Sequence, residues 1–322
     1  MGHMIDGTWH VDEQLARLEL GRFQRPPSTF RRRVTADGRE DGYAAEAGRY
    51  HLYVSLACPW AHRTLIMRAL KGLESMITVS VVHWAMLDQG WTFEPGPGVV
   101  PDPIHGARAL HDVYRHADPH YTGRVTVPVL WDRHTGTIVN NESAEILRML
   151  NGAFDTRGAR AGDYYPAALR PEIDAVNDRI YHTLNNGVYR CGFAATQDAY
   201  DEAVAQLFDT LDWLEGRLAR QRYLAGDVLT EADIRLYPTL ARFDLVYHSH
   251  FKCMRQRLVE FPNLWGYTRD LYQQSAFRTT TDFEHIRRHY YFSQRKVNPL
   301  GIVPVAYRVD FDAPHDRARR FG

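Results

Sequence analysis

The sequence has few cysteines, no excess of charge of one sign and no long apolar run, and each absence excludes a class of protein. Three cysteines among 322 residues are too few for a disulfide framework, which indicates a reducing, cytoplasmic setting. Lys plus Arg and Asp plus Glu number 39 each, without the clustered basic charge that nucleic-acid binding requires. No apolar run is long enough to span a bilayer and no signal peptide is recognisable, so we expect no membrane association.

Length and patterning together predict two domains behind an N-terminal extension. A chain of 322 residues, 44% of them hydrophobic, exceeds what one domain usually holds. Residues 1–45 are rich in Arg, Asp and Gly and have little periodicity, so we interpret them as an extension over the fold, and we give Met1–Met4 no structural role. We place one domain at residues 46–155 and a second at 166–322, which includes a C-terminal extension.

The first predicted domain alternates strands and helices. Residues 50–56 alternate apolar and polar side chains, as a strand does. Cys58-Pro59 then opens a helix, because proline suits a first helical position. A second strand at 77–81 and a long irregular stretch from 86 to about 123 come next, followed by a hairpin and a helix at residues 127–131, 137–139 and 142–150. This order is that of a thioredoxin-like α/β domain.

The second predicted domain is all-helical. After Pro166 the strand signals stop, and apolar residues recur at helical spacing over 169–184 and 203–218. Thr230 and Asp233 have the spacing of a capping box, which predicts a helix that begins there. A further helix is expected after residue 263, and the tail from 298 is expected to be irregular.

Cys58 is the strongest candidate for a nucleophile. It lies where the first strand ends and a helix begins, and there the helix dipole favours thiolate over thiol. The motif C-P-W-A has no second cysteine, so the resolving thiol must come from outside, and glutathione is the natural cytosolic candidate. The alternative is a buried, inert cysteine. Cys191 and Cys253 lack this context, and we expect them to be packed in the core.

Two further motifs are suited to bind glutathione. Val127-Pro128 precedes a strand where thioredoxin-like domains carry a cis-proline, which exposes the preceding backbone to a peptide-like ligand. Glu142 and Ser143 fall at the start of the next helix. The Ser143 hydroxyl and free N–H groups are suited to the γ-glutamyl carboxylate, and Glu142 is suited to its ammonium group. Alone, a Glu-Ser pair is only a common helix start.

Several blocks of the sequence resemble the Xi-class glutathione transferases, which are the glutathionyl-hydroquinone reductases. The resemblance covers nearly everything after residue 45, except about residues 310–322. It implies a glutathione-transferase fold and a homodimer assembled through the helical domains. The blocks are S-L-A-C-P-W-A-H-R (55–63), A-D-P (117–119), G-R-V-T-V-P-V-L-W-D (123–132), N-E-S-A-E-I (141–146), 242–247, 250–253, 289–291 and N-P-L-G-I-V-P (298–304).

The resemblance also implies roles for individual residues. Cys58 would be the nucleophile, and Tyr189 would donate or accept a proton near the quinol. Tyr247 and Tyr290 would line the acceptor pocket and help to stabilise the thiolate. The residues expected to contact glutathione are Trp91, Arg124, Val127, Glu142 and Ser143.

The expected substrates are glutathione and a glutathionyl-quinol. In this hypothesis the Cys58 thiolate attacks the sulfur of a glutathionyl-hydroquinone, Tyr189 protonates the departing carbon, and a Cys58–glutathione mixed disulfide remains. A second glutathione then releases glutathione disulfide. Chlorinated hydroquinones, menadiol and plant-derived quinols are all compatible with the sequence.

Three alternatives stand beside this hypothesis. An omega-like thiol transferase or a reductive dehalogenase would use the same cysteine. A non-catalytic binding module would be expected to lose Cys58 or the Glu-Ser pair, and neither is lost. A metal site is suggested by histidines crowded in one loop, but no carboxylate or thiolate ligand pattern accompanies them, so we expect no metal. These histidines are His105, His111, His116 and His120.

Overall fold

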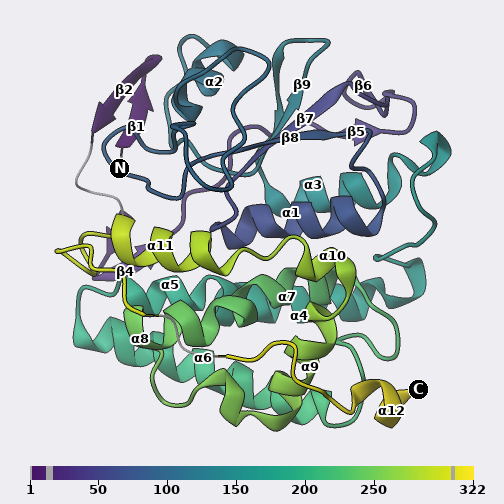
Figure 1. Cartoon of the computed structure of the whole chain (residues 1–322), viewed down its shortest axis with the longest axis vertical. Coiled ribbons are helices and arrows are strands. Elements are labelled where there is room, and N and C mark those ends of the chain that lie inside the picture. Colours follow the sequence, from purple (N-terminus) through teal and green to yellow (C-terminus); the bar gives the residue numbers. More distant parts are fainter. Residues whose placement is uncertain (1, 12–16, 306–308) are drawn as a thin grey trace. The chain divides into compact units, whose positions relative to one another are not determined.

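The computed structural model describes residues 2–11, 17–305 and 309–322, and backbone contacts divide it into two units (Figure 1). Unit 1 contains the N-terminal residues, Pro27–Gly162 and Thr280–His289. Unit 2 contains residues 17–26, Asp163–Thr279 and the described residues from Tyr290 onward. Residues 17–26, from the predicted extension, thus belong to the helical unit.

Unit 1 is built on a four-stranded sheet with strand order β10-β9-β7-β8. The central strand β7 is buried at all five residues, pairs in parallel with β8 and pairs antiparallel with β9. In Figure 1, α1 and α3 lie side by side on one side of this sheet, and α2 lies on the other. The elements are β7 Tyr50–Val54, α1 Pro59–Leu70, β8 Thr78–Val81, α2 Leu110–Ala117, β9 Val129–Asp132, β10 Thr137–Asn140, α3 Ser143–Gly152 and η1 Asp155–Arg157.

The order of these elements confirms the predicted β-α-β, loop, β-β-α pattern, but the loop prediction for residues 86–123 was partly wrong. The helix α2 lies inside that stretch. The predicted extension also forms short strands: the hairpins β1 Gly2–Ile5 with β2 Thr8–Val11 and β3 Arg17–Glu19 with β4 Arg22–Gln24, and the parallel pair β5 Val34–Thr35 with β6 Tyr43–Ala44.

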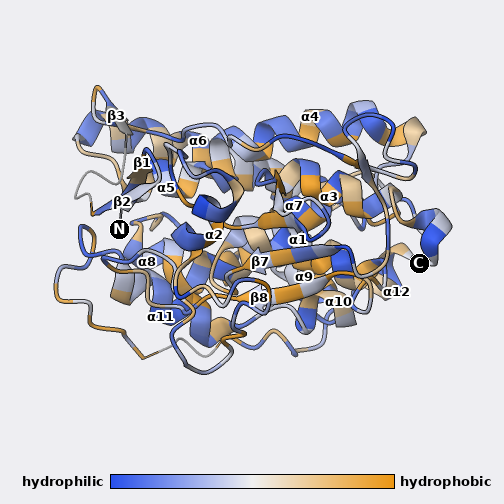
Figure 2. Cartoon of the chain, turned by 90° about the horizontal axis from the view of Figure 1, so that it is seen from above, coloured by the Kyte–Doolittle hydropathy of each residue, from blue (hydrophilic) through white to orange (hydrophobic). Residues whose placement is uncertain are grey.

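Unit 2 is helical apart from the β3–β4 hairpin. Its helices expose polar residues and bury apolar ones, and Figure 2 shows both kinds along α4. None of the helices in the described residues is both long and apolar enough to cross a membrane. The elements are η2 Ala167–Leu169, α4 Arg170–Ile180, η3 Tyr181–Asn185, α5 Gly187–Gly192, α6 Gln197–Leu218, α7 Glu231–Arg242, η4 Phe243–Tyr247, α8 His248–His250, η5 Leu258–Glu260, α9 Pro262–Tyr272, α10 Ser275–Arg278, α11 Phe283–Ser293, which begins in unit 1, and α12 Arg317–Phe321.

The predicted capping box at the start of α7 is confirmed and lies deep in unit 2. The Thr230 N–H donates to the Asp233 carboxylate at 2.8 Å. The same carboxylate accepts from the Leu224 N–H at 2.9 Å and from the Tyr267 hydroxyl at 2.7 Å. Burial raises the pKa of Asp233, and these hydrogen bonds oppose that rise. The box therefore joins the helix start to a neighbouring loop and helix.

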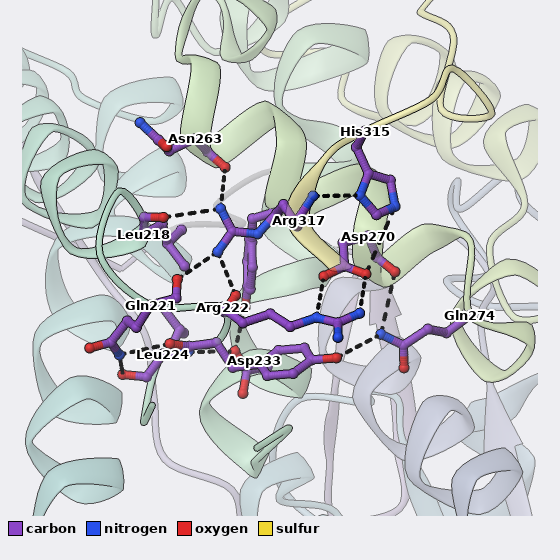
Figure 3. A network of polar contacts seen from close by, with 12 residues as sticks. Leu218, Gln221, Arg222, Leu224, Asp233, Asn263, Asp270, Gln274, His315 and Arg317 are labelled. Atoms are coloured by element: carbon purple, nitrogen blue, oxygen red, sulfur yellow. Dashed lines mark hydrogen bonds and ion pairs between the residues drawn. The ribbon is translucent and has the colours of Figure 1, made fainter. Parts of the chain in front are cut away.

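The C-terminal tail was predicted to be irregular, and this was partly wrong, because the tail ends in the helix α12. The side chain of Arg317, from this helix, packs inside unit 2 (Figure 3). Arg317 is only 2% exposed. Its guanidinium donates to the carbonyls of Leu218, Gln221 and Arg222 at 3.0, 2.6 and 2.6 Å. Carbonyls at the end of a helix such as α6 have no partner within the helix. Arg317 therefore caps the end of α6 from 99 positions away in the chain.

Replacement of Arg317 by alanine should destabilise the protein by about 2–4 kcal/mol, because one buried and two part-buried carbonyls would lose their donor. Urea unfolding followed by circular dichroism measures this change. Arg319→Ala, an exposed position on the same helix, is the matched control and should change stability by less than about 0.5 kcal/mol. Equal stability of the two variants would contradict the capping role.

A second prediction concerns His51, a buried residue of β7. The Ser80 hydroxyl donates to the Pro101 carbonyl, so it accepts from Nε2–H of His51, at 2.9 Å. Burial, followed by repulsion from Arg133, lowers the pKa of His51 to about 4. The unfolded chain binds this proton near pH 6.5, so the stability contribution of neutral His51 is present above pH 6.5 and is lost as the pH falls towards 4.

Unfolding at a series of pH values checks this sign. Between pH 6.5 and 4, wild type should lose up to about 2–3 kcal/mol more stability than His51→Gln, which cannot take up the proton. His134→Gln, an exposed position, should follow wild type. A His51→Gln protein whose stability falls as steeply as that of wild type would contradict the assignment.

Candidate active site

Cys58 lies where the chain passes from the central strand into α1. It is the N-cap residue of that helix, and Pro59 takes the first helical position, as the sequence predicted. The side chain is half-buried. Its thiol donates to the backbone carbonyl of Val127, with 3.6 Å between Sγ and the oxygen. The positive end of a helix dipole favours thiolate, so this position suits a nucleophile.

The Val127–Pro128 peptide bond is cis, as predicted. The side chain of Val127 is buried, and its carbonyl lies beside Cys58 as described. Arg124 lies three positions earlier and is exposed. Its carbonyl accepts a hydrogen bond of 2.9 Å from the hydroxyl of Tyr121, three residues earlier in the chain.

Glu142 and Ser143 mark the start of α3, as predicted. Glu142 is the N-cap residue, and its carboxylate accepts from the Ala144 N–H at 3.2 Å. The carboxylate also accepts from the hydroxyl of Ser28 at 2.9 Å, and from that of Ser143 at 3.4 Å. The two side chains that were predicted to bind opposite charges of one ligand are thus in contact with each other.

Trp91 is 7% exposed and stacks on His289 of α11, with 4.7 Å between ring centroids and 26° between planes. The His289 Nδ1 lies 2.9 Å from the Trp84 carbonyl. A carbonyl only accepts, so Nδ1 carries the proton. The imidazole is therefore fixed in orientation, and it fixes the indole plane of Trp91 in turn.

In unit 2, Tyr189, Tyr247 and Tyr290 form a hydroxyl cluster, which we call the tyrosine triad. The Tyr290 hydroxyl lies 2.6 Å from that of Tyr189 and 2.9 Å from that of Tyr247. Tyr189 comes from α5, Tyr247 from the end of η4 and Tyr290 from α11. Phe251 packs against all three rings, at centroid distances of 5.4 to 5.7 Å.

Burial makes two phenols of the triad, Tyr247 and Tyr290, weaker acids. It raises the pKa of both Tyr247 and Tyr290 well above 10, and the neighbouring Tyr189 reinforces this rise in both. Arg242 acts in the opposite direction on each. Near neutral pH these two phenols therefore stay protonated and can donate hydrogen bonds.

The structure thus groups the predicted residues within each unit. Cys58 contacts Val127, and Glu142 contacts Ser143. The three tyrosines of the triad are joined through the hydroxyl of Tyr290. The sequence analysis did not identify four residues that contact the candidate site residues. Ser28 donates to Glu142 and His289 stacks on Trp91, while Arg25 and Phe251 both lie against the ring of Tyr189. Phe251 and His289 fall within blocks that carried the family resemblance. Ser28 and Arg25 lie in the extension, where no pattern marked them.

Two of the four crowded histidines contact each other, and the other two contact residues near the N-terminus. His105 stacks on His116 at 4.1 Å, His111 stacks on Trp9 at 4.8 Å, and the His120 Nδ1 lies 2.6 Å from an Asp6 carboxylate oxygen. Within the described residues, no group of three or more His, Cys, Asp or Glu side chains has the arrangement of a metal site. A cavity of about 310 Å³ in the same region contains none of the predicted site residues; it is lined by Gly106, Ala107, Arg108, Asp112, Arg115 and His116.

The two units have the architecture of a glutathione transferase, and the family models agree. The glutathione S-transferase N-terminal domain matches residues 57–153, and the glutathione S-transferase C-terminal domain matches residues 197–270. Both matches fall inside the units described above.

Known relatives show which class of glutathione transferase this chain resembles. The glutathionyl-hydroquinone reductase YqjG of Escherichia coli is 55% identical over the whole of both chains. Its glutathione-bound structure has a TM-score of 0.92 and covers 99% of this chain and 100% of its own. The glutathionyl-hydroquinone reductase PcpF of Sphingobium chlorophenolicum is 56% identical over 95% of this chain and 96% of its own. The Xi-class glutathione transferase of Natrialba magadii is 49% identical, with a TM-score of 0.92 over 99% of this chain and 97% of its own.

The chain therefore belongs to the Xi-class glutathione transferases, the family of the glutathionyl-hydroquinone reductases. The match to YqjG over the full length extends the resemblance beyond what the sequence motifs indicated, because it includes residues 1–45 and 310–322.

The raised pKa values of Tyr247 and Tyr290 predict that these phenols stay protonated at pH 10, where an exposed tyrosine is half ionised. Ultraviolet titration of tyrosinate measures this directly. In a Tyr189→Phe background, which removes the phenol that Tyr290 contacts, the further change Tyr290→Phe should leave the folded protein's titration below pH 10 unchanged. In denaturant the same variant should show one tyrosinate fewer. A loss of signal below pH 10 in the folded protein would contradict the prediction.

Proposed function

We propose that this protein uses glutathione to reduce glutathionyl-hydroquinones to free hydroquinones. The observation that carries the proposal is Cys58 at the N-cap of α1, beside Val127, in a chain 55% identical to the reductase YqjG over its full length. The glutathione-bound structure of YqjG supports glutathione as the co-substrate.

The reaction proceeds in two nucleophilic displacements, each at a glutathione sulfur. The Cys58 thiolate attacks the sulfur of the glutathionyl-hydroquinone, so an S–S bond forms and the carbon–sulfur bond breaks. The aromatic carbon takes a proton from a tyrosine, which we assign as Tyr189, and leaves as the hydroquinone. The proton of a second glutathione restores the Tyr189 phenol, and its thiolate attacks the Cys58–glutathione disulfide. This step releases glutathione disulfide and regenerates the Cys58 thiolate. The substrate carbon is reduced, and two glutathione sulfurs are oxidised to the disulfide.

Each remaining candidate residue takes a binding role. The backbone of Val127 pairs with the cysteinyl part of glutathione, and Trp91 and Arg124 contact the rest of the tripeptide. Glu142 and Ser143 hold the γ-glutamyl group at the start of α3. Tyr247 and Tyr290 line the quinol pocket and support the thiolate as neutral hydrogen-bond donors, which agrees with their raised pKa values.

The setting of the enzyme is part of the proposal. We assign it to the cytoplasm, as a homodimer that requires glutathione and no metal. We keep the functional boundaries expected from the sequence, with an extension at residues 1–45, a glutathione-binding domain at 46–155 and a helical domain at 166–322, although residues 17–26 belong to unit 2 and residues 280–289 to unit 1. The rings and hydroxyls of the tyrosine triad suit an aromatic, hydroxylated substrate, which agrees with a quinol.

Incubation with glutathionyl-menadiol and glutathione, followed by chromatography of free menadiol, tests this function. Wild type should release the quinol, and Cys58→Ala should lower the rate by at least about 100-fold because the nucleophile is lost. Cys191→Ala removes a buried thiol that the proposed reaction does not use and should retain most of the activity, which controls for general thiol loss.

Two other outcomes have distinct meanings. If no quinol is released but mass spectrometry finds glutathione on Cys58, the thiol chemistry stands and an omega-like thiol transferase becomes the better assignment. If Cys58→Ala remains fully active, Cys58 is not the nucleophile. Conjugation of chlorodinitrobenzene is the contrasting assay and should be weak.

A further inference from the structure

We propose that Arg25, in the N-terminal segment, is a positioning residue that makes Tyr189 the proton-donating phenol of the tyrosine triad. This inference rests on the proposed function and deepens it, because it explains why one phenol of the three donates the proton. It also gives the segment before residue 27 a role in unit 2.

The guanidinium of Arg25 lies over the aromatic face of Tyr189. Its Cζ is 4.8 Å from the Tyr189 ring centroid and 5.4 Å from that of Phe23. Both distances are within the range of a cation–π interaction. Phe23 is buried in β4 and packs on Phe193 at 5.5 Å, so the segment that carries Arg25 is itself anchored in unit 2.

Arg25 also holds the start of the helix that carries Tyr189. Its Nε donates to the Asn186 side-chain carbonyl at 2.8 Å. Asn186 is the N-cap residue of α5, and its backbone carbonyl accepts from the Tyr189 N–H at 3.1 Å. One guanidinium therefore contacts both the phenol ring and the residue from which its helix begins. A planar guanidinium on a rigid fork is suited to such a double contact.

A cation over a phenol ring stabilises the phenolate, because the ring becomes more negative as the proton leaves. The Tyr290 hydroxyl, 2.6 Å away, can donate to the same phenolate. Tyr247 and Tyr290 are 0% and 1% exposed, whereas Tyr189 is 8% exposed. Tyr189 thus combines the contact with Arg25 and the greatest exposure of the three phenols.

Other charged or titratable groups around the triad do not replace Arg25. Arg242 favours the ionised forms of Tyr247 and Tyr290 and is buried, with Nη1 on the Pro238 carbonyl at 2.8 Å. Arg190 follows Tyr189 in α5 but is paired with Glu202 at 3.1 Å. Beyond Phe251, burial lowers the pKa of His250 to about 4, so it is neutral near pH 7.

The activity test compares Arg25→Gln, Arg25→Lys and wild type as full-length enzymes. A general acid must be protonated, so kcat for quinol release falls at high pH as Tyr189 ionises. In Arg25→Gln, the pH at which kcat falls should increase by about 0.5–1 unit, because Tyr189 loses the nearby cation. The same variant should have a kcat at pH 7 that is about 3- to 10-fold lower, because its phenol is a weaker acid. KM for glutathione should not change. Arg25→Lys keeps the charge and should restore most of the shift.

Arg22→Gln is the matched control. Arg22 lies in β4, three positions before Arg25, and pairs with Glu202 at the surface. Its replacement should leave the alkaline limb where it is in wild type. An equal shift in Arg22→Gln and Arg25→Gln would overturn the proposal, because the effect would then come from the hairpin as a whole.

A second readout does not depend on the reaction. Arg25→Gln should raise the pKa of one phenol in ultraviolet titration by about 0.5–1 unit, and this change should vanish in a Tyr189→Phe background. A shift that persists in that background, or none at all, overturns the role of Arg25. If wild type releases no quinol but the titration behaves as expected, the proposed function fails while the Arg25–Tyr189 coupling stands.

Discussion

The site in unit 1 depends on the place where the buried strand β7 ends and α1 begins. β7 is covered on both faces and paired on both edges, so its end is fixed by the whole sheet. The turn after it is closed by a hydrogen bond of 3.1 Å from the Cys58 N–H to the Ser55 carbonyl. Proline at the first helical position then fixes the direction of α1. The thiol position beside Val127 is thus a consequence of sheet packing.

Unit 2 positions its candidate site residues in a different way. Two π-helical segments, η3 and η4, interrupt its regular helices. One ends just before α5, which carries Tyr189, and the other contains Tyr247. A π segment inserts one residue into a helix and rotates the following side chains, and such segments occur often at functional sites. The insertions thus contribute to the directions from which these two hydroxyls meet Tyr290.

The fold class, the position of Cys58, the cis bond at Pro128 and the capping box at Thr230 could all be predicted, because each has a local signal in spacing or residue type. The helix α2 was missed because it lies within a stretch rich in Pro, Gly and His. The π segments have no signal in a pattern read at 3.6 residues per turn. Arg25 and Ser28 act through contacts more than 100 positions away, with Asn186 and Glu142, which no local pattern encodes.

Neither unit is a continuous piece of the chain. Unit 1 includes residues 280–289, and unit 2 takes up residues 17–26, which precede almost all of unit 1. A cut between Gly162 and Asp163 would therefore remove α11 residues from one half, and Phe23 and Arg25 from the other. The two halves cannot be exchanged between relatives as independent cassettes at that junction. Recombination or protein engineering that respects this architecture must move three segments together.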